Sequence, residues 1–208
     1  MTVQAKDKFY FDGEQFALFD VSDGKALSCV KCVGGLSEDV CCTACYRGSV
    51  ASYEVADGIL LLREAAGFDE LKDVPAFSFF SERGAVTKEA RVRPGAIIPF
   101  TGHLIITRGG WPMDFFSSVF DADKAYELEF DEGLFVGATD LEDFIKAGRT
   151  YLETAGQEER RELPIDAGEI IAEVGKLSRV SPKGRYTYST YVWRFDEADC
   201  VLCKSIDS

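Results

Sequence analysis

Seven cysteines stand out in this chain of 208 residues, because six of them form three Cys-x-x-C units. Two residues between a pair of cysteines let both thiolates face one ion, and two such units supply the four ligands of a tetrahedral zinc site. The chain has a single histidine, so thiolates are the ligands at hand for a soft metal. The three units are Cys29 with Cys32, Cys42 with Cys45, and Cys200 with Cys203, and Cys41 is the remaining cysteine.

The spacing of the units leaves two groupings open. Nine residues separate the first unit from the second, fewer than the roughly 15 to 20 of a common four-cysteine ribbon. The other grouping joins the first unit to the third and clips a loop near the N-terminus to the end of the chain. Free cysteines also pack as small hydrophobic residues, which is the competing interpretation. The preferred metal ligands are Cys29, Cys32, Cys200 and Cys203, with Cys42 and Cys45 as alternates, and a structural zinc ion is the only cofactor indicated.

The charge balance points to a basic protein partner. The chain carries 36 Asp and Glu against 23 Lys and Arg, a net charge of −13, whereas nucleic acids and anionic membranes need dense Lys and Arg. Nine acids and one base lie between Asp121 and Asp143. A solvated strand face followed by a helix start would also collect acids there, but complementary charge speeds encounter with a cationic partner. The residues expected to contact that partner are Glu127, Glu129, Asp131, Glu132, Glu142 and Asp143.

The sequence contains no motif that predicts catalysis. It lacks a phosphate-binding loop, a dinucleotide fingerprint, a G-x-S-x-G elbow and a zincin helix. Arg47 and His103 are expected to brace a sheet, and we assign no catalytic residue. The first residues form no apolar signal segment, and no stretch reaches about 18 apolar residues. We therefore expect a cytoplasmic protein with reduced thiols that binds neither nucleic acid nor membrane; its oligomeric state is not predicted.

β-Hairpins are expected to position the candidate acidic and cysteine residues. The segments 9–20 and 49–63 each place an Asp-Gly pair, Asp12-Gly13 and Asp57-Gly58, between two apolar runs, and tight hairpin turns favour that pair because both central residues need positive φ. Residues 126–136 form a third hairpin, with apolar side chains on one face of its first strand and Glu127 and Glu129 on the other. Alternation of this kind is typical of a half-buried antiparallel strand.

Two further strands are predicted. Residues 96–107 form a long β-branched run whose start is interrupted by Pro99. Residues 186–195 are the most aromatic segment of the chain. The charged segment 81–93 between the second hairpin and these strands reads as an exposed loop or a short edge element.

The helices are expected late in the chain. Thr139 and Glu142 have the spacing of a capping box, apolar residues recur behind them at helical spacing, and Gly156 suits a C-cap. A weaker helix is predicted within 166–177. The class is therefore α+β, a mostly antiparallel sheet built from hairpins, with one or two helices in the C-terminal half. We predict one domain over 1–208, with a cysteine-bearing loop at 28–45 and a C-terminal tail at 196–208.

The segment from Thr43 to Leu62, TACYRGSVASYEVADGILLL, resembles the core motif of an uncharacterised bacterial protein family, approximately A-L-W-R-G-Y-x-A-x-[FWY]-E-[IV]. The later segment 100–109 is similar to that family's W-F-[ST]-G-x-L pattern. Tyr46 and Ser49 depart from the family's usual aromatic residues, and Cys45 stands where an aliphatic residue is usual. The resemblance implies a fold but no activity, and it favours the third Cys-x-x-C unit over the second as a metal ligand.

These observations lead to three functional hypotheses. The first is a non-enzymatic protein-binding module of immunity or regulatory type that uses its acidic surface. The second is an accessory protein stabilised by a structural four-cysteine zinc site. The third is an enzyme of unrecognised type.

Overall fold

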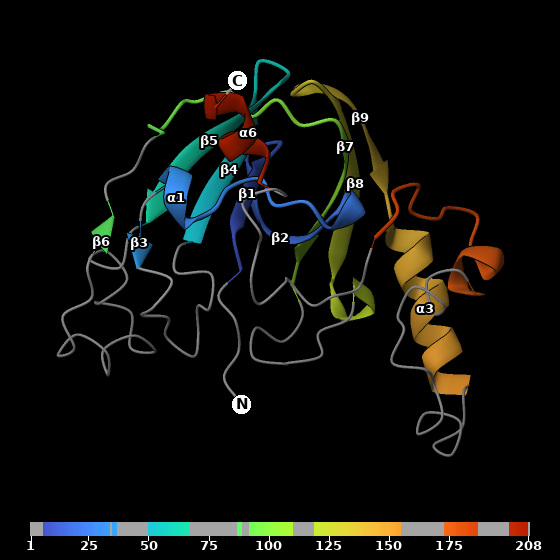
Figure 1. The fold of residues 1–208 in the computed structure, drawn as a ribbon. Helices are drawn as coiled ribbons and strands as arrows, with labels where there is room; N and C mark the ends of the chain where they lie inside the picture. The colour runs from blue at the N-terminus through green and yellow to red at the C-terminus, as the bar shows by residue number, and fades with distance from the viewer. Residues whose placement is uncertain are drawn as a thin grey trace, which may run out of the picture.

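The computed structural model describes residues 6–33, 35–36, 50–66, 87–88, 92–109, 119–154, 173–186 and 200–207. Within these residues seven strands close into a barrel in the order β1-β2-β7-β8-β9-β5-β4 (Figure 1). The barrel strands are β1 (Lys8–Phe11), β2 (Glu14–Val21), β4 (Val50–Ala56), β5 (Ile59–Ala66), β7 (Gly102–Arg108), β8 (Lys124–Asp131) and β9 (Leu134–Asp140). A separate small sheet pairs β3 (Gly35–Leu36) with β6 (Thr87–Lys88). The labelled helical elements are η1 (Ser22–Gly24), α1 (Val30–Val33), η3 (Val119–Asp121), α3 (Glu142–Thr154) and α6 (Val201–Asp207), and residues 173–177 are also helical.

The three predicted hairpins are present, as β1-β2, β4-β5 and β8-β9. Asp12 and Gly13 have φ of 51° and 75°, and Asp57 and Gly58 have φ of 50° and 75°. Positive φ at both central residues matches the twist of the turn to the twist of the strands, which is why Asp-Gly suits both positions. The local sequence therefore determines these turns.

The sheet is mostly antiparallel, as predicted, but one parallel pairing makes it mixed and closes it into a barrel, which was not predicted. β1 pairs in parallel with β4, with Lys8 opposite Ser52 and Tyr10 opposite Glu54. This pairing joins the first hairpin to the second and closes the barrel, which leaves fewer open strand edges than a flat sheet would have. The class remains α+β, but strand closure depends on contacts far apart in the sequence and has no local signature.

The predicted strand 96–107 divides into two parts at its proline. The regular strand β7 begins at Gly102, and the preceding residues lie against β5 instead, where Ile98 N donates to Leu60 O at 3.0 Å and Leu62 N donates to Ala96 O at 2.9 Å. β5 and β9 pair directly only at Ile59 and Leu134. The stretch before β7 therefore supplies backbone partners to β5 where the barrel strands diverge.

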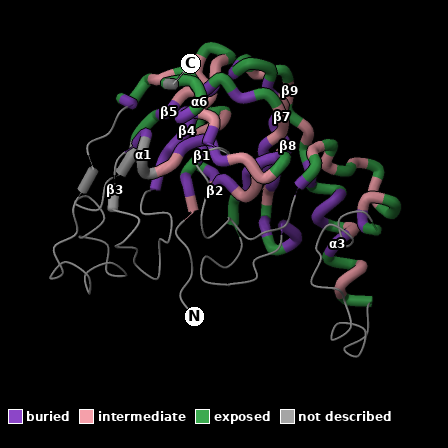
Figure 2. Tube along the Cα trace, in the orientation of Figure 1, coloured by how far each residue is buried: buried purple, intermediate pink, exposed green. Residues whose placement is uncertain are grey.

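The buried residues form two groups. Figure 2 shows buried positions both along the barrel strands and on α3. Alternate residues of β7 and β8 point inward, so Leu104, Ile106 and Leu128 join the barrel core. Ile105 faces outward and is covered by Phe144 and other residues of the second group. Helix α3 starts where β9 ends and packs against η3 and β8 (Figure 1).

The start of α3 differs from the predicted capping box. Strand β9 continues to Asp140, which pairs with Tyr126, so Thr139 belongs to the sheet. The Oδ1 atom of Asp140 instead accepts a hydrogen bond from the backbone N–H of Glu142 at 2.8 Å. A carboxylate at this position satisfies a free N–H group of the first turn, as a threonine hydroxyl would have done.

The remaining predicted elements are described in part. Residues 173–177 are helical, within the weaker predicted helix 166–177, whose earlier residues lie outside the described ranges. Of the predicted strand 186–195, the structure describes Tyr186 alone.

Candidate metal centre

Backbone hydrogen bonds bring the end of the chain to the segment that follows the first hairpin. Ala26 and Cys200 form a parallel bridge, and Val201 N donates to Ala26 O at 2.8 Å. Leu202 N donates to Leu27 O at 3.3 Å, and the side chains of both leucines are buried in the barrel core group. Helices α1 and α6 therefore lie side by side at one end of the barrel (Figure 1).

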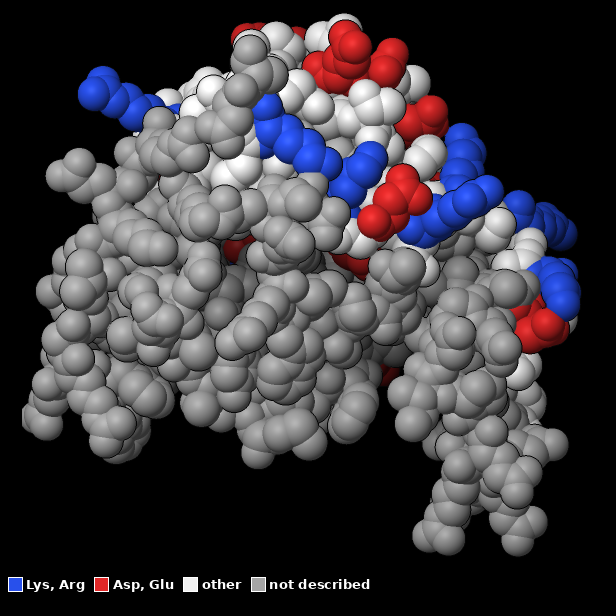
Figure 3. All heavy atoms as spheres, viewed as in Figure 1, with Lys and Arg blue, Asp and Glu red and all other residues white. Residues whose placement is uncertain are grey.

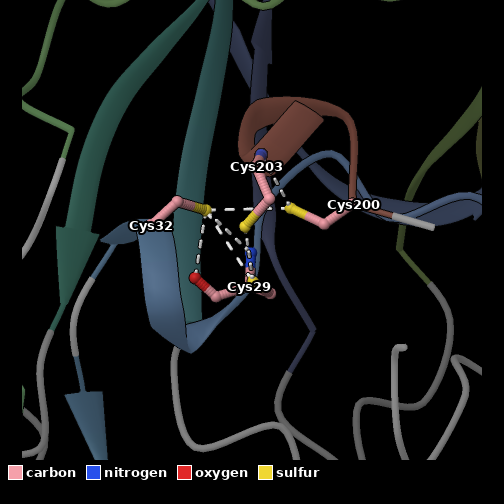
Figure 4. Close-up of side chains that lie close together, drawn as sticks. All are labelled: Cys29, Cys32, Cys200 and Cys203. Atoms are coloured by element: carbon pink, nitrogen blue, oxygen red, sulfur yellow. Dashed lines mark hydrogen bonds between the residues drawn. The ribbon is translucent and has the colours of Figure 1, made fainter. Parts of the chain in front are cut away.

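The units Cys29–Cys32 and Cys200–Cys203 each stand at a turn that directs two thiols the same way. In the first unit, the N–H groups of Cys32 and Val33 both donate to Cys29 O at 3.0 Å, which makes the first turn of α1. In the third unit, Cys200 precedes α6 and Cys203 lies in its first turn. The two turns face one another, so all four sulfur atoms point into one small space (Figure 4).

The four Sγ atoms lie within 4.8 Å of one another. Cys29 Sγ is 3.3 Å from Cys203 Sγ and 4.0 Å from Cys32 Sγ, and Cys32 Sγ is 3.8 Å from Cys200 Sγ. A tetrahedral ion with metal–sulfur bonds of about 2.3 Å needs sulfur–sulfur edges of about 3.8 Å. The arrangement therefore fits a metal ion with small adjustments of the side chains.

The surroundings suit thiolate ligands. Cys32, Cys200 and Cys203 are buried and Cys29 is partly buried. Two backbone N–H groups donate to sulfur, from Cys29 to Cys32 Sγ at 3.1 Å and from Cys203 to Cys200 Sγ at 3.4 Å. Such donors stabilise negative charge on sulfur in the buried site.

Without a metal, the thiols resist ionisation. Burial and then the contact with Cys29 raise the pKa of Cys203. Contacts with Cys29 and Cys32, followed by burial, raise the pKa of Cys200. Four crowded thiolates repel one another unless a cation lies between them, so metal binding must displace protons from these groups.

The structure brings together the preferred metal set and leaves the alternates undecided. Cys29, Cys32, Cys200 and Cys203 form the one group of three or more metal-ligating side chains found among the described residues. Cys41, Cys42 and Cys45 lie outside the described residues, as does Arg47.

The prediction that Glu127 contacts a partner is wrong, because Glu127 is buried. It is 2% exposed. Its Oε1 accepts hydrogen bonds from Lys183 N at 2.8 Å, Gly184 N at 2.9 Å and the Tyr186 hydroxyl at 2.8 Å. The carboxylate anchors the segment around residue 184 to the outer face of β8. Charge alternation correctly assigned its face, but it did not indicate that a distant segment covers it.

The other predicted acidic residues lie nearer the surface, where Glu142 and Glu129 contact bases. Glu142 pairs with Lys146 at 2.7 Å, which holds the pKa of Glu142 below its ordinary value. Glu129 Oε2 lies 3.7 Å from Lys183 Nζ. Figure 3 shows acidic side chains interspersed with Lys and Arg across this face of the molecule. The exposed members of the predicted set are Asp131, Glu132, Glu142 and Asp143.

His103 lies beside this buried carboxylate, in a polar group that the sequence did not indicate. Its Nδ1 is 3.9 Å from Glu127 Oε1 and has no hydrogen-bond partner within the described part of the chain. Burial and the Glu127 carboxylate raise the pKa of Tyr186, and burial raises the pKa of Asp20 to about 7. These groups come from β2, β7, β8 and the segment before residue 187, so no local pattern connects them.

None of the helices in the described ranges is long and apolar enough to cross a membrane. Comparisons with protein-family models, curated protein sequences and solved structures give no significant match.

Proposed function

We propose that this chain is a non-enzymatic binding protein in which a structural zinc ion holds the C-terminal end against the barrel. The observation that carries the proposal is the convergence of two Cys-x-x-C units, with four sulfur atoms within 4.8 Å of one another. Zinc suits the site because it prefers four thiolates in a tetrahedron and imposes no other geometry.

The ion's role is structural. A catalytic zinc keeps a coordination position open for water or substrate, whereas four protein thiolates fill the coordination sphere. The ligands also come from both ends of the chain, so binding the ion favours the folded arrangement over the unfolded one. The hydrogen bonds between residues 26–27 and 201–202 orient the two turns before the ion binds.

Metal analysis tests this proposal. Protein purified without chelators should contain close to one zinc ion per chain, and the Cys200→Ser/Cys203→Ser variant should contain none. The Cys42→Ser/Cys45→Ser variant removes the same number of thiols and should keep its zinc. Loss of zinc from the Cys42/Cys45 variant but not from the Cys200/Cys203 variant would transfer the site to the alternate ligands, and absence of zinc from the wild type would refute the proposal.

We also propose that the β8-β9 turn contacts a basic partner. Asp131 and Glu132 are exposed there, and Leu134, 58% exposed, follows them. Ile97 is 56% exposed and lies close to this turn. Its Cγ2 atom would be 3.5 Å from a Cβ placed on Gly133. Exposed apolar side chains ringed by charge are typical of a protein contact surface, because the apolar atoms gain from burial and the charges select the partner.

Charge reversal at the turn tests this second proposal. Proteins captured from cells of the source organism are compared for wild type, Asp131→Lys/Glu132→Lys and Glu142→Lys/Asp143→Lys by quantitative mass spectrometry. The last variant changes the charge equally, at exposed positions on α3. A basic partner retained by wild type and the α3 variant but lost from the turn variant would support the proposal, and identical capture by all three would refute it.

A further inference from the structure

Two short sulfur–sulfur contacts join different Cys-x-x-C units. Cys29 Sγ lies 3.3 Å from Cys203 Sγ, and Cys32 Sγ lies 3.8 Å from Cys200 Sγ. Within the first unit, the two sulfurs are 4.0 Å apart. A disulfide bond is about 2.05 Å long, so the pairs that start closest need the least movement to form one. The geometry therefore favours disulfides that join α1 to α6 over a Cys29–Cys32 disulfide within the first unit.

The four cysteine residues also differ in exposure. Cys29 is partly buried, whereas the other three are buried. Oxidants react with exposed thiolates before buried ones. Cys29, the most exposed of the four residues, thus has its sulfur next to that of Cys203.

From these two observations we propose that the metal centre is also an oxidation site. There a peroxide replaces the metal cross-link between α1 and α6 with disulfide bonds between them. The proposal rests on the proposed zinc site. Oxidation releases the ion and leaves two disulfides, Cys29–Cys203 first and Cys32–Cys200 second. Each disulfide joins the N-terminal turn to α6, so the two ends of the chain stay linked in both states.

The chemistry is a two-electron oxidation of each cysteine pair. The Cys29 thiolate attacks one oxygen of hydrogen peroxide, the O–O bond breaks, and hydroxide leaves, so Cys29 becomes a sulfenic acid. The Cys203 thiolate then attacks that sulfur and displaces a second hydroxide, which forms the S–S bond. Two peroxide molecules oxidise the four thiolates, and with four protons they yield two disulfides and four water molecules while the ion leaves.

Disulfide mapping after limited oxidation tests this inference. Zinc-loaded wild type is treated with one and then two equivalents of hydrogen peroxide, and the released zinc is followed with a chromogenic chelator. Trypsin cuts after Lys31 and chymotrypsin after Leu202, so each of the four cysteines is carried on its own peptide for mass spectrometry without reduction. One equivalent should give mainly the Cys29–Cys203 pair, and two should add Cys32–Cys200 with release of the ion.

Two variants and one control complete the experiment. The Cys203→Ser variant removes the partner of Cys29, so Cys29 should accumulate sulfenic acid that dimedone traps, whereas Cys41→Ser should oxidise like wild type. Disulfides within the units, Cys29–Cys32 and Cys200–Cys203, would overturn the inference. The same mapping is repeated on reduced, metal-free protein. If purified protein contains no zinc, the proposed zinc site is overturned, and the disulfides mapped in the metal-free protein still test the pairing.

Discussion

Removal of the metal from the four-cysteine centre should lower the free energy of unfolding by a large amount, because the metal cross-link closes a long loop. Cys32 and Cys200 are 168 positions apart in the sequence. The loop-closure relation for a cross-link of this span gives an entropy of about −17 cal/mol/K in the unfolded chain, which corresponds to about 5 kcal/mol at 25 °C. Unfolding entropy of about 2.1 cal/mol/K per residue, over 208 residues, gives about 0.44 kcal/mol/K. We therefore expect the Tm to fall by about 12 °C when the ion is removed.

Differential scanning calorimetry measures this effect. Wild type is scanned with zinc and after treatment with a chelator, which removes the ion and leaves every side chain in place. The Cys200→Ser/Cys203→Ser variant should unfold at or below the temperature of the chelated wild type, and chelator should not change its Tm. A wild-type Tm that moves by less than about 2 °C on chelation, or a variant that responds to chelator as wild type does, would refute the loop-closure reasoning.

Three other predictions concern the outer face of the barrel. Glu127→Ala should destabilise the fold by about 3 kcal/mol, because it leaves buried donors without an acceptor, whereas Glu129→Ala should change stability by less than about 0.5 kcal/mol in urea unfolding. Burial raises the pKa of Asp20 to about 7. Its folded carboxyl therefore binds more protons than the unfolded one between about pH 4 and pH 7, and stability falls as pH rises through that window. Asp20→Asn should remove this pH dependence and stabilise the protein above pH 7 by at most about 4 kcal/mol. Unfolding midpoints measured across pH check this. Parallel plots of stability against pH for wild type and variant would contradict the raised pKa of Asp20. Gly148→Ala should destabilise by about 2 kcal/mol, because the new Cβ meets the Phe120 ring, and a gain in thermal stability would contradict this packing.

Local patterns predicted those features that a few neighbouring residues control. Tight hairpin turns require positive φ at both central residues, and Asp-Gly pairs adopt it readily. The two Asp-Gly pairs therefore located two hairpin turns correctly. Alternation along β8 placed Leu128 and Phe130 in the barrel core and Glu127 on the opposite face. The capping box failed by one residue, because β9 extends to Asp140 and the side chain of Asp140 supplies the cap instead.

The cysteine site was predictable as chemistry but not as geometry. Cys-x-x-C spacing directs two thiols to one side of a turn, which identifies each half of the site without any structure. The choice between Cys42 with Cys45 and Cys200 with Cys203 as the second half depends on which turn meets α1. The backbone pairing of Ala26 with Cys200 brings the C-terminal unit there.

By itself the sequence determined the hairpins, the faces of their strands and the residue types of the metal centre, since each depends on dihedral preferences or spacing within a few positions. The tertiary structure alone decided that β1 pairs in parallel with β4 and closes the barrel. It also decided that the segment around Gly184 covers Glu127, so a residue that looks like surface charge serves as a buried anchor. Both outcomes arise from contacts between segments far apart in the chain, where burial and hydrogen bonding outweigh the preferences of individual residues.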